Sequence, residues 1–184
     1  MKGENFMKEK ILIGIEREIS ILEDIQKDFL DSIKDKGTFD SLEKYKAVHE
    51  SDCGIYIFYL SNTDFPYSEK EYNEIKKEIK KSKSVFLPRF NNQNLNIKIE
   101  SKKCLYVGSS KKLLSRLAEH FTESHPNTYA LHLSEWANQI EQNITFQILE
   151  INKNNASDIN NKMQKCEDIL WDSLKPILGK QGKK

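Results

Sequence analysis

Cysteine is scarce in this sequence, and its spacing does not form a metal-binding pattern. The three cysteines, Cys53, Cys104 and Cys166, lie far apart, and no C-x-x-C pair occurs. This spacing argues against a structural zinc site and against a disulfide framework. It fits a reducing environment, so the sequence predicts a cytoplasmic protein.

Long apolar runs are absent as well. No stretch approaches the ~18 consecutive apolar residues that indicate a membrane-spanning helix. The first ten residues are too polar for the apolar segment of a signal peptide. We therefore expect neither membrane association nor export. The 184 residues, 38% of them hydrophobic and 31% charged, suffice for one globular domain with a substantial hydrophobic core.

The chain also lacks an excess of charge of either sign. Its 29 basic and 28 acidic residues give a formal net charge of +1, so a polyanion would have to bind at a local basic patch. Lysines cluster at 76–83 and at 180–184, which indicates either solvated surfaces or DNA contacts. The lysines that we single out as candidate DNA-binding residues are Lys76, Lys80, Lys112 and Lys180.

Apolar residues recur every three or four positions between residues 8 and 33, which predicts a long amphipathic helix. They are Ile11, Ile15, Ile19, Leu22, Ile25, Phe29 and Ile33. Gly37 and Thr38 are expected to end it. Either the apolar stripe packs on the chain's own core, or it forms the seam of a homodimer, since its steps are close to a heptad. Residues 1–50 are accordingly predicted to be an N-terminal helical extension.

Residues 51–184 are predicted to form the main domain, of class α+β. Apolar segments at 53–60, 104–108 and 144–151 predict three strands, and amphipathic segments at 111–121, 129–140 and 157–174 predict helices. The helix at 111–121 has a serine just before it as the expected N-cap. An insertion of about 62–102 separates the first two strands; it is expected to be exposed and to carry a charged helix that starts at a Ser68–Glu71 capping box.

Two tripeptides on the first two predicted strands carry a family resemblance. Gly54-Ile55-Tyr56 and Tyr106-Val107-Gly108 resemble the two halves of the GIY-YIG nuclease motif. Either tripeptide alone would be weak. The set is more specific because Arg116 follows Tyr106 by ten positions, His120 follows Arg116 by four, and Glu167 lies in the last predicted helix.

The resemblance covers about residues 53–179, without the insertion. It implies a small three-stranded antiparallel sheet flanked by helices, and metal-dependent cleavage of phosphodiester bonds, with DNA as partner and Mg²⁺ or Mn²⁺ as cofactor. Carried over by position, Tyr56 and Tyr106 match the two motif tyrosines, Arg116 and His120 match the helix arginine and histidine, and Glu167 matches the metal-binding glutamate.

Elementary chemistry is compatible with these roles. The planar fork of Arg116 suits a phosphate, and His120 and Lys112 are expected on the same helix face. Glu167, at the edge of an apolar stripe, suits a Mg²⁺ ion that keeps several waters. Tyr56 is assigned as general base, which requires stabilisation of its phenolate, and Tyr106 as a supporting residue.

Each of these assignments has a plainer alternative. The cationic helix face can be a solvated surface, and the two tyrosines can be core aromatics. Glu167 can be an exposed glutamate that pairs with Lys165 or Lys175.

Two features depart from the family pattern. Tyr56 and Tyr106 are fifty positions apart, where the family usually has only a hairpin turn. One hypothesis is that the insertion contacts DNA beside the cut, through its lysine-rich helix and residues 91–96. Many family members also have an asparagine a few residues after the proline that corresponds to Pro176. Here residues 179–182 read Gly-Lys-Gln-Gly, and Lys180 or Gln181 are the candidate replacements.

Three functions remain open at this point. The first is an active DNA endonuclease of the restriction, phage-defence or mobile-element kind. The second is a nucleic-acid-binding module on the same fold that does not cut. The third is an interaction protein in which the tripeptides are coincidental. The ordered presence of Tyr106, Arg116, His120 and Glu167 favours the first.

Overall fold

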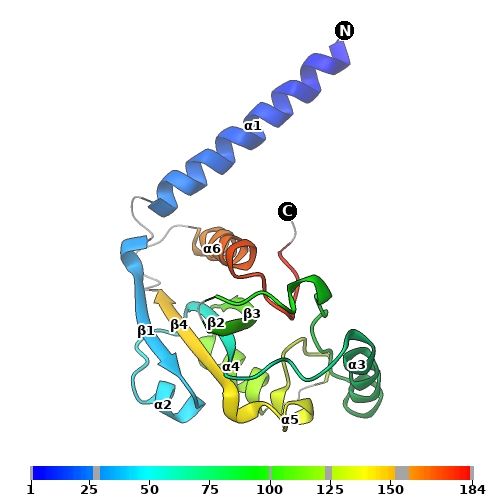
Figure 1. The fold of residues 1–184 in the computed structure, drawn as a ribbon. Coiled ribbons are helices and arrows are strands. Elements are labelled where there is room, and N and C mark those ends of the chain that lie inside the picture. Colours follow the sequence, from blue (N-terminus) through cyan, green and yellow to red (C-terminus); the bar gives the residue numbers. More distant parts are fainter. Residues whose placement is uncertain (1, 27–29, 100, 123–125, 152–157, 183–184) are drawn as a thin grey trace.

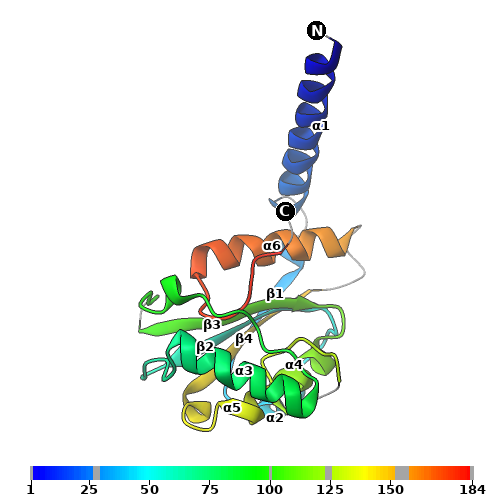
Figure 2. The same cartoon turned by 90° about the vertical axis from the view of Figure 1, so that its right-hand side faces the viewer.

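The computed structural model describes residues 2–26, 30–99, 101–122, 126–151 and 158–182. Within these residues the chain forms an α+β fold, in which a four-stranded antiparallel sheet lies between helices on both of its faces (Figures 1 and 2). None of the described helices is both long enough and apolar enough to cross a bilayer.

The sheet has the strand order β1-β4-β2-β3. Its strands are β1 (Ile33–Phe39), β2 (Gly54–Ser61), β3 (Lys102–Ser110) and β4 (Ile144–Ile151). The helices are α1 (Lys2–Asp24), α2 (Leu42–Lys46), α3 (Glu69–Lys83), α4 (Leu113–Phe121), α5 (Leu133–Trp136) and α6 (Ile159–Leu174). In Figure 2, α6 covers one face of the sheet and α2 to α5 cover the other.

Strand β2 is central and separates two hydrophobic clusters. Its side chains alternate between the two faces, as strand geometry requires. Tyr56, Phe58 and Leu60 join the larger cluster, with residues of α3, α4 and α5. Ile55 and Ile57 join the smaller one, with residues of α6. Burial of one such side chain contributes roughly 1.5–3 kcal/mol, so both faces of β2 help to hold the fold together.

The three predicted strands are present, and the sheet contains a fourth strand, β1, that was not predicted. The predicted helix at 8–33 ends at Asp24 instead, and Ile33 opens the edge strand β1, opposite Ile151. Gly37 and Thr38 lie within β1, where the register shifts after Asp35 and Gly37 takes a φ of +86°. Residues 33–39 therefore belong to the sheet and not to a helical extension.

The contacts described between helix α1 and the body lie in the C-terminal half of the helix. Ile21 packs against the smaller cluster, and Glu18 and Asp24 form ion pairs with Lys165 and Lys162 of α6. The rest of the helix extends away from the body (Figures 1 and 2). Part of the predicted stripe, together with Leu12, is 41–54% exposed: Leu12, Ile15, Ile19 and Leu22. Phe29 lies outside the described residues, and the homodimer seam stays a prediction.

The insertion is packed onto the core, contrary to the expectation that it is exposed. Helix α3 starts with the predicted capping box, in which both the Ser68 and the Glu71 bonds are formed. The insertion nevertheless adds six side chains to the larger cluster: Phe65, Tyr72, Ile79, Val85, Leu87 and Phe90. Its polar 91–96 stretch is also partly buried, and this overturns the idea that the whole stretch is free to reach DNA.

Asn91 and Asn94 hold the C-terminal segment instead. Both are 4% exposed. The Asn91 amide donates to the carbonyls of Pro176 at 3.2 Å and Gly179 at 3.0 Å, and Asn94 donates to Pro176 at 2.9 Å. The backbone N–H groups of Ile177 and Leu178 donate to β3. The C-terminal segment thus lies along the outer edge of β3, with the insertion beyond it.

Asn91→Ala is expected to lower the free energy of unfolding by about 1–3 kcal/mol. The substitution leaves the carbonyl of Gly179 without its side-chain donor, whereas the carbonyl of Pro176 keeps the hydrogen bond from Asn94. The loss of a partner by one buried polar group costs about this much. Urea unfolding followed by circular dichroism measures this change. The neighbouring exposed Asn92 is the matched control, because Asn92→Ala should change stability by no more than ~0.5 kcal/mol. Equal effects of the two substitutions would contradict the proposal that Asn91 holds the C-terminal segment in place.

One predicted helix is much shorter than expected. The segment predicted as a helix at 129–140 is helical only at Leu133–Trp136. His132, directly before it, has a left-handed backbone with φ of +49°, so a continuous helix cannot run through it. The irregular backbone that results leaves the carbonyl of Tyr129 free to accept a side-chain hydrogen bond, which is described below.

Candidate active site

Tyr56 is the centre of the candidate site. It lies on β2 and is 1% exposed. Its phenol oxygen lies 3.2 Å from Nε of Arg116 and 3.0 Å from Nε2 of His120. Arg116 and His120 reach it together because they are four residues apart on α4 and therefore lie on one face of the helix. The structure thus brings three of the five predicted catalytic residues into direct contact.

The proton on His120 can be assigned from its second contact. The backbone N–H of Leu131 donates to Nδ1 of His120 at 2.9 Å, so Nδ1 is the acceptor. In a neutral imidazole the other nitrogen then carries the proton. Burial lowers the pKa of His120 well below its usual value, which keeps the ring neutral. His120 therefore donates to Tyr56, and the Tyr56 oxygen receives two N–H groups.

Burial and charge act in opposite directions on Tyr56. Burial is the largest effect and raises the pKa of the phenol, and Tyr106 raises it further. The charge and the hydrogen bond of Arg116 oppose this shift but do not overcome it. The phenol is consequently neutral near pH 7, and a base role would be stronger at alkaline pH.

Gly108 is required by the position of the Tyr56 ring. The two residues are directly opposite each other in the β2–β3 register. A Cβ at position 108 would lie 2.6 Å from both Cζ and the hydroxyl oxygen of Tyr56. No side chain fits at that distance, so the ring can lie across the β3 backbone only because residue 108 is glycine. This is a physical reason for the pairing of the two tripeptides.

Tyr106 lies beside Tyr56 and His120. The rings of Tyr106 and Tyr56 are stacked, with centroids 6.3 Å apart and an angle of 16° between their planes, and the ring of His120 is 5.2 Å from that of Tyr106. Burial raises the pKa of Tyr106 to about 12. Gly179 packs closely on the ring of Tyr106, since a Cβ there would be 3.1 Å from Cε2. The C-terminal segment is therefore one wall of the site.

Arg116 is anchored by Tyr56, Glu119 and Tyr129. Besides Tyr56, its Nη1 pairs with Glu119 at 2.6 Å and its Nη2 donates to the carbonyl of Tyr129 at 2.5 Å. The side chains of Arg116 and Glu119 are 24% and 21% exposed. The guanidinium is thus held at the edge of the site. A phosphate would have to share it with Glu119 or displace that carboxylate.

Glu167 faces β3 from α6. The hydroxyl of Ser109, next to Gly108, donates to its Oε2 at 2.6 Å. Burial raises the pKa of Glu167, and the bond from Ser109 opposes this shift. The two lysines that were alternative partners of Glu167 form other ion pairs: Lys165 pairs with Glu18, and Lys175 pairs with Asp172. Glu167 is therefore a half-buried carboxylate beside the second tripeptide.

The candidate lysines are less closely tied to the site. Lys76 donates to the carbonyl of Pro88 at 3.2 Å, and burial lowers its pKa. The ammonium of Lys80 lies 5.2 Å from the centre of the Phe86 ring. Both side chains thus contact the insertion itself. Lys180 is exposed and follows the site wall at Gly179.

The start of α4 differs from the prediction. The N-cap residue is Lys112 and not a serine, and Leu113 is the first helical residue. The hydroxyl of Ser110 accepts from the backbone N–H of Lys112 at 3.0 Å. Lys112 is exposed and precedes the helix, so its expected place on the helix face of Arg116 and His120 is wrong.

Several contributors to the site were missed in the sequence. Ser109 follows the second tripeptide directly, and Glu119 has the three-residue spacing of a helical ion pair with Arg116, so both could have been found. The backbone groups of Leu131 and Tyr129 have no comparable signal. Their positions depend on how the irregular segment after α4 folds back over the helix.

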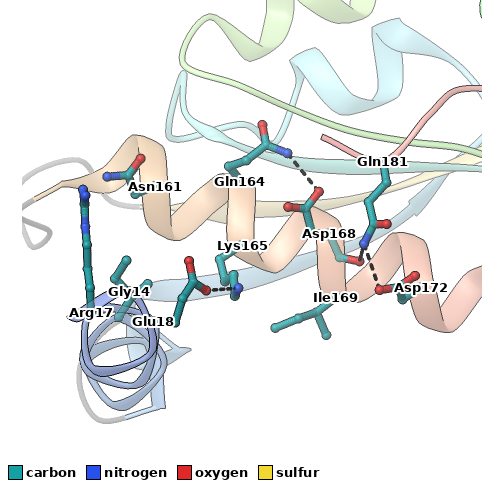
Figure 3. A pocket seen from close by; sticks show the side chains of 11 residues that line it. Gly14, Arg17, Glu18, Asn161, Gln164, Lys165, Asp168, Ile169, Asp172 and Gln181 are labelled. Atoms are coloured by element: carbon teal, nitrogen blue, oxygen red, sulfur yellow. Dashed lines mark hydrogen bonds and ion pairs between the residues drawn. The ribbon is translucent and has the colours of Figure 1, made fainter. Parts of the chain in front are cut away.

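A polar hollow between α1 and α6 lies apart from this site (Figure 3). Its lining residues are Gly14, Arg17, Glu18, Ile21, Asn161, Gln164, Lys165, Asp168, Ile169, Asp172 and Gln181. None of the five predicted catalytic residues is among them. Gln181 donates to Asp172 here at 2.8 Å. The buried amides that contact the C-terminal segment come from Asn91 and Asn94.

Comparison of the chain with protein-family models, with curated proteins and with solved structures found no match. The site geometry and the sequence motifs are therefore the grounds on which a function is proposed.

Proposed function

We propose that the protein is a GIY-YIG-type endonuclease that hydrolyses phosphodiester bonds in DNA with one divalent cation. The observation that carries the proposal is the pair of N–H donors, from Arg116 and His120, on the buried oxygen of Tyr56. Two such donors stabilise a phenolate, as a general base requires. The β3-β2-β4 part of the sheet, with α4 and α6 on opposite faces, supports the three-stranded arrangement that the resemblance implies.

Tyr56 would first lose its own proton to solvent, and its phenolate would then take the proton of the attacking water. The N–H of His120 and the positive charge of Arg116 would stabilise this phenolate before it accepts the proton. Because His120 stays neutral, its hydrogen bond persists through the neutral pH range. Tyr106 would support the reaction by packing along Tyr56 and excluding water from one side of it.

Glu167, with the hydroxyl of Ser109 beside it, would hold Mg²⁺ or Mn²⁺. Both groups are oxygen donors, which hard cations prefer, and a single carboxylate leaves room for the waters that Mg²⁺ retains. When bound, the cation would supply positive charge at the phosphate oxygens and acidify water. Water must complete its coordination, because no group of three or more His, Cys, Asp or Glu side chains that could hold a metal occurs among the described residues.

Incubation of a supercoiled plasmid with the purified protein tests the proposal. We expect nicked or linear product with Mg²⁺ or Mn²⁺ and none with excess chelator. The same reaction is run with linear duplex, single-stranded DNA and RNA. Absence of cutting with every metal and every substrate would overturn the nuclease and favour the second candidate function.

That second candidate is a nucleic-acid-binding module that does not cut. The observation in its favour is that Arg116 is already satisfied by Tyr56, Glu119 and Tyr129. A guanidinium held in this way has a structural role whether or not a phosphate binds.

Glu119→Gln separates the two roles of Arg116. The substitution removes a negative charge next to the guanidinium and weakens its internal ion pair. If Arg116 binds phosphate, DNA affinity should rise about threefold to fivefold, the magnitude of a partly exposed charge interaction. Fluorescence anisotropy with a labelled oligonucleotide measures this change. Glu141→Gln, at an exposed position outside α4, is the control. Unchanged affinity in Glu119→Gln would assign Arg116 a structural role only.

A further inference from the structure

Tyr129 is an exposed aromatic residue that the backbone holds at the edge of the candidate site. The residue is 40% exposed. Its carbonyl accepts the hydrogen bond from Nη2 of Arg116 at 2.5 Å, and its backbone forms a β-bridge with Phe86 of the insertion. Tyr129 is therefore held by two elements, α4 through Arg116 and the insertion through Phe86. An exposed aromatic residue that is fixed in this way has a surface available to a ligand.

Arg89 lies next to Tyr129 on the same edge. Its backbone N–H is close enough to the Tyr129 phenol to lower the pKa of that group against the larger, raising effect of burial. Its carbonyl accepts from the N–H of Gly179 at 2.8 Å, and Gly179 packs on the ring of Tyr106. The side chain of Arg89 is exposed, and no partner for it occurs among the described residues. The insertion thus places an exposed arginine next to Tyr129.

This pairing of groups matches a nucleic-acid strand with unpaired bases. An aromatic ring binds a base by stacking on its face, and arginine binds phosphate through its planar fork. In a continuous duplex the faces of each base are covered by its neighbours. The ring of Tyr129 can therefore stack only where a base is unpaired or displaced, as in a single strand, a flap or an overhang.

We propose that Tyr129 stacks on an unpaired base next to the phosphate bound at the site, and that Arg89 binds a second phosphate of the same DNA strand. The inference rests on the proposed function, because it takes the phosphate at Arg116 as its reference point. It adds the substrate class: DNA that is single-stranded at the point of cleavage. It also assigns the insertion a role through Arg89, in place of the role expected for its lysines.

Binding is measured without cleavage, so that the inference and the nuclease activity are tested separately. The probe is a fluorescently labelled single-stranded oligonucleotide of about 12 nucleotides, and a duplex of the same sequence is the comparison. Anisotropy titrations are run in the presence of a chelator with four variants: Tyr129→Ala, Tyr129→Leu, Tyr129→Phe and Arg89→Ala. Arg17→Ala, on α1, is the control for loss of a cation elsewhere.

Tyr129→Ala and Tyr129→Leu are expected to weaken single-strand binding about tenfold, and Tyr129→Phe to change it by less than about twofold, because only Phe keeps a ring for stacking. Duplex binding should be weaker and unaffected by all three. Arg89→Ala should reduce the salt dependence of binding by about one ion, which Arg17→Ala should not do. Thermal unfolding confirms that each variant is folded.

Equal single-strand binding by Tyr129→Leu and Tyr129→Phe would overturn stacking, since leucine keeps the bulk of the side chain without the aromatic face. Equal losses for the single strand and the duplex would overturn the substrate class. These outcomes differ from failure of the proposed function. If the protein binds the single strand through Tyr129 but cuts no substrate, this inference is retained and the proposed nuclease activity is rejected. If the native protein cuts single-stranded and duplex DNA equally well, and Tyr129→Ala cuts both at the native rate, the nuclease is retained and the inference is lost.

Discussion

Glu167→Gln reduces metal-dependent DNA cleavage by at least about a thousandfold, if the proposed cation site is correct. The amide keeps the shape of the side chain and can still accept the hydrogen bond from Ser109, which is 2.6 Å long in the native protein. It removes the negative charge that would hold the cation, whose charge stabilisation in the transition state amounts to several kcal/mol. Initial rates of plasmid nicking, over a range of Mg²⁺ or Mn²⁺ concentrations, measure the loss.

The loss should not come from unfolding. Burial raises the pKa of Glu167 in the folded protein, so the ionised carboxylate is a destabilising group above its unfolded pKa, and folding becomes more favourable as the pH falls and the group is protonated. A neutral glutamine removes this cost at neutral pH. We therefore expect the variant to be at least as stable as the native protein in thermal unfolding.

Asp168→Asn provides the matched control. Asp168 is the next residue on α6, but its carboxylate accepts from the backbone N–H of Gly182 at 3.0 Å and lines the hollow between α1 and α6. Removing its charge should leave cleavage within about threefold of the native rate, a small surface-charge effect. Undiminished cutting by Glu167→Gln would contradict the metal role and point to a contaminating nuclease.

Tyr56→Phe is expected to lower kcat by about 10²- to 10⁴-fold, the range for loss of a general base. The change also leaves the N–H groups of Arg116 and His120 without their shared acceptor in a buried site, which should cost about 1–3 kcal/mol of stability. Both effects follow from the loss of the Tyr56 hydroxyl oxygen. Urea unfolding and single-turnover cleavage measure them separately, at concentrations where the variant is folded.

The pH dependence gives a second readout for Tyr56. Because burial holds its pKa above the usual value, only a small fraction is deprotonated near pH 7, and this fraction grows about tenfold per pH unit. The rate in the native protein should therefore rise from pH 6 to about pH 8 with a slope close to one, and the slope should be lost in Tyr56→Phe.

Tyr59→Phe is the control on the same strand. Tyr59 lies on β2, three residues from Tyr56, and packs against the smaller cluster on the other face of the sheet. It should retain both the rate and the pH slope. A Tyr56→Phe variant that keeps the native slope would show that another group takes the proton.

Local patterns in the sequence predicted several elements well. Strand β4 has the predicted bounds, Ile144–Ile151, and α6 ends at Leu174, before Pro176, as expected. The capping box at Ser68 is formed. These features depend on alternation, capping and helix termination, which act over a few residues and need no distant partner.

Elements that depend on distant partners were predicted less well. Ile33 continues the apolar spacing of the preceding helix, yet it forms a strand because β4 offers an edge to pair with. The insertion looked exposed because its helix is highly charged. It is buried on one side because its aromatic residues find a place in the larger cluster, together with Trp136. Such pairings are decided by contacts across the chain, which the local pattern does not contain.

The same distinction between local patterns and distant contacts applies to the candidate site. By itself the sequence determined the two tripeptides, the common helix face of Arg116 and His120, and the carboxylate at position 167. Only the tertiary structure decided that both helix residues donate to the Tyr56 oxygen, that Gly108 makes room for its ring, and that Asn91 secures the wall of the site. Spacing along one element sets which side chains share a face, whereas strand register and the packing of irregular backbone set what those side chains meet.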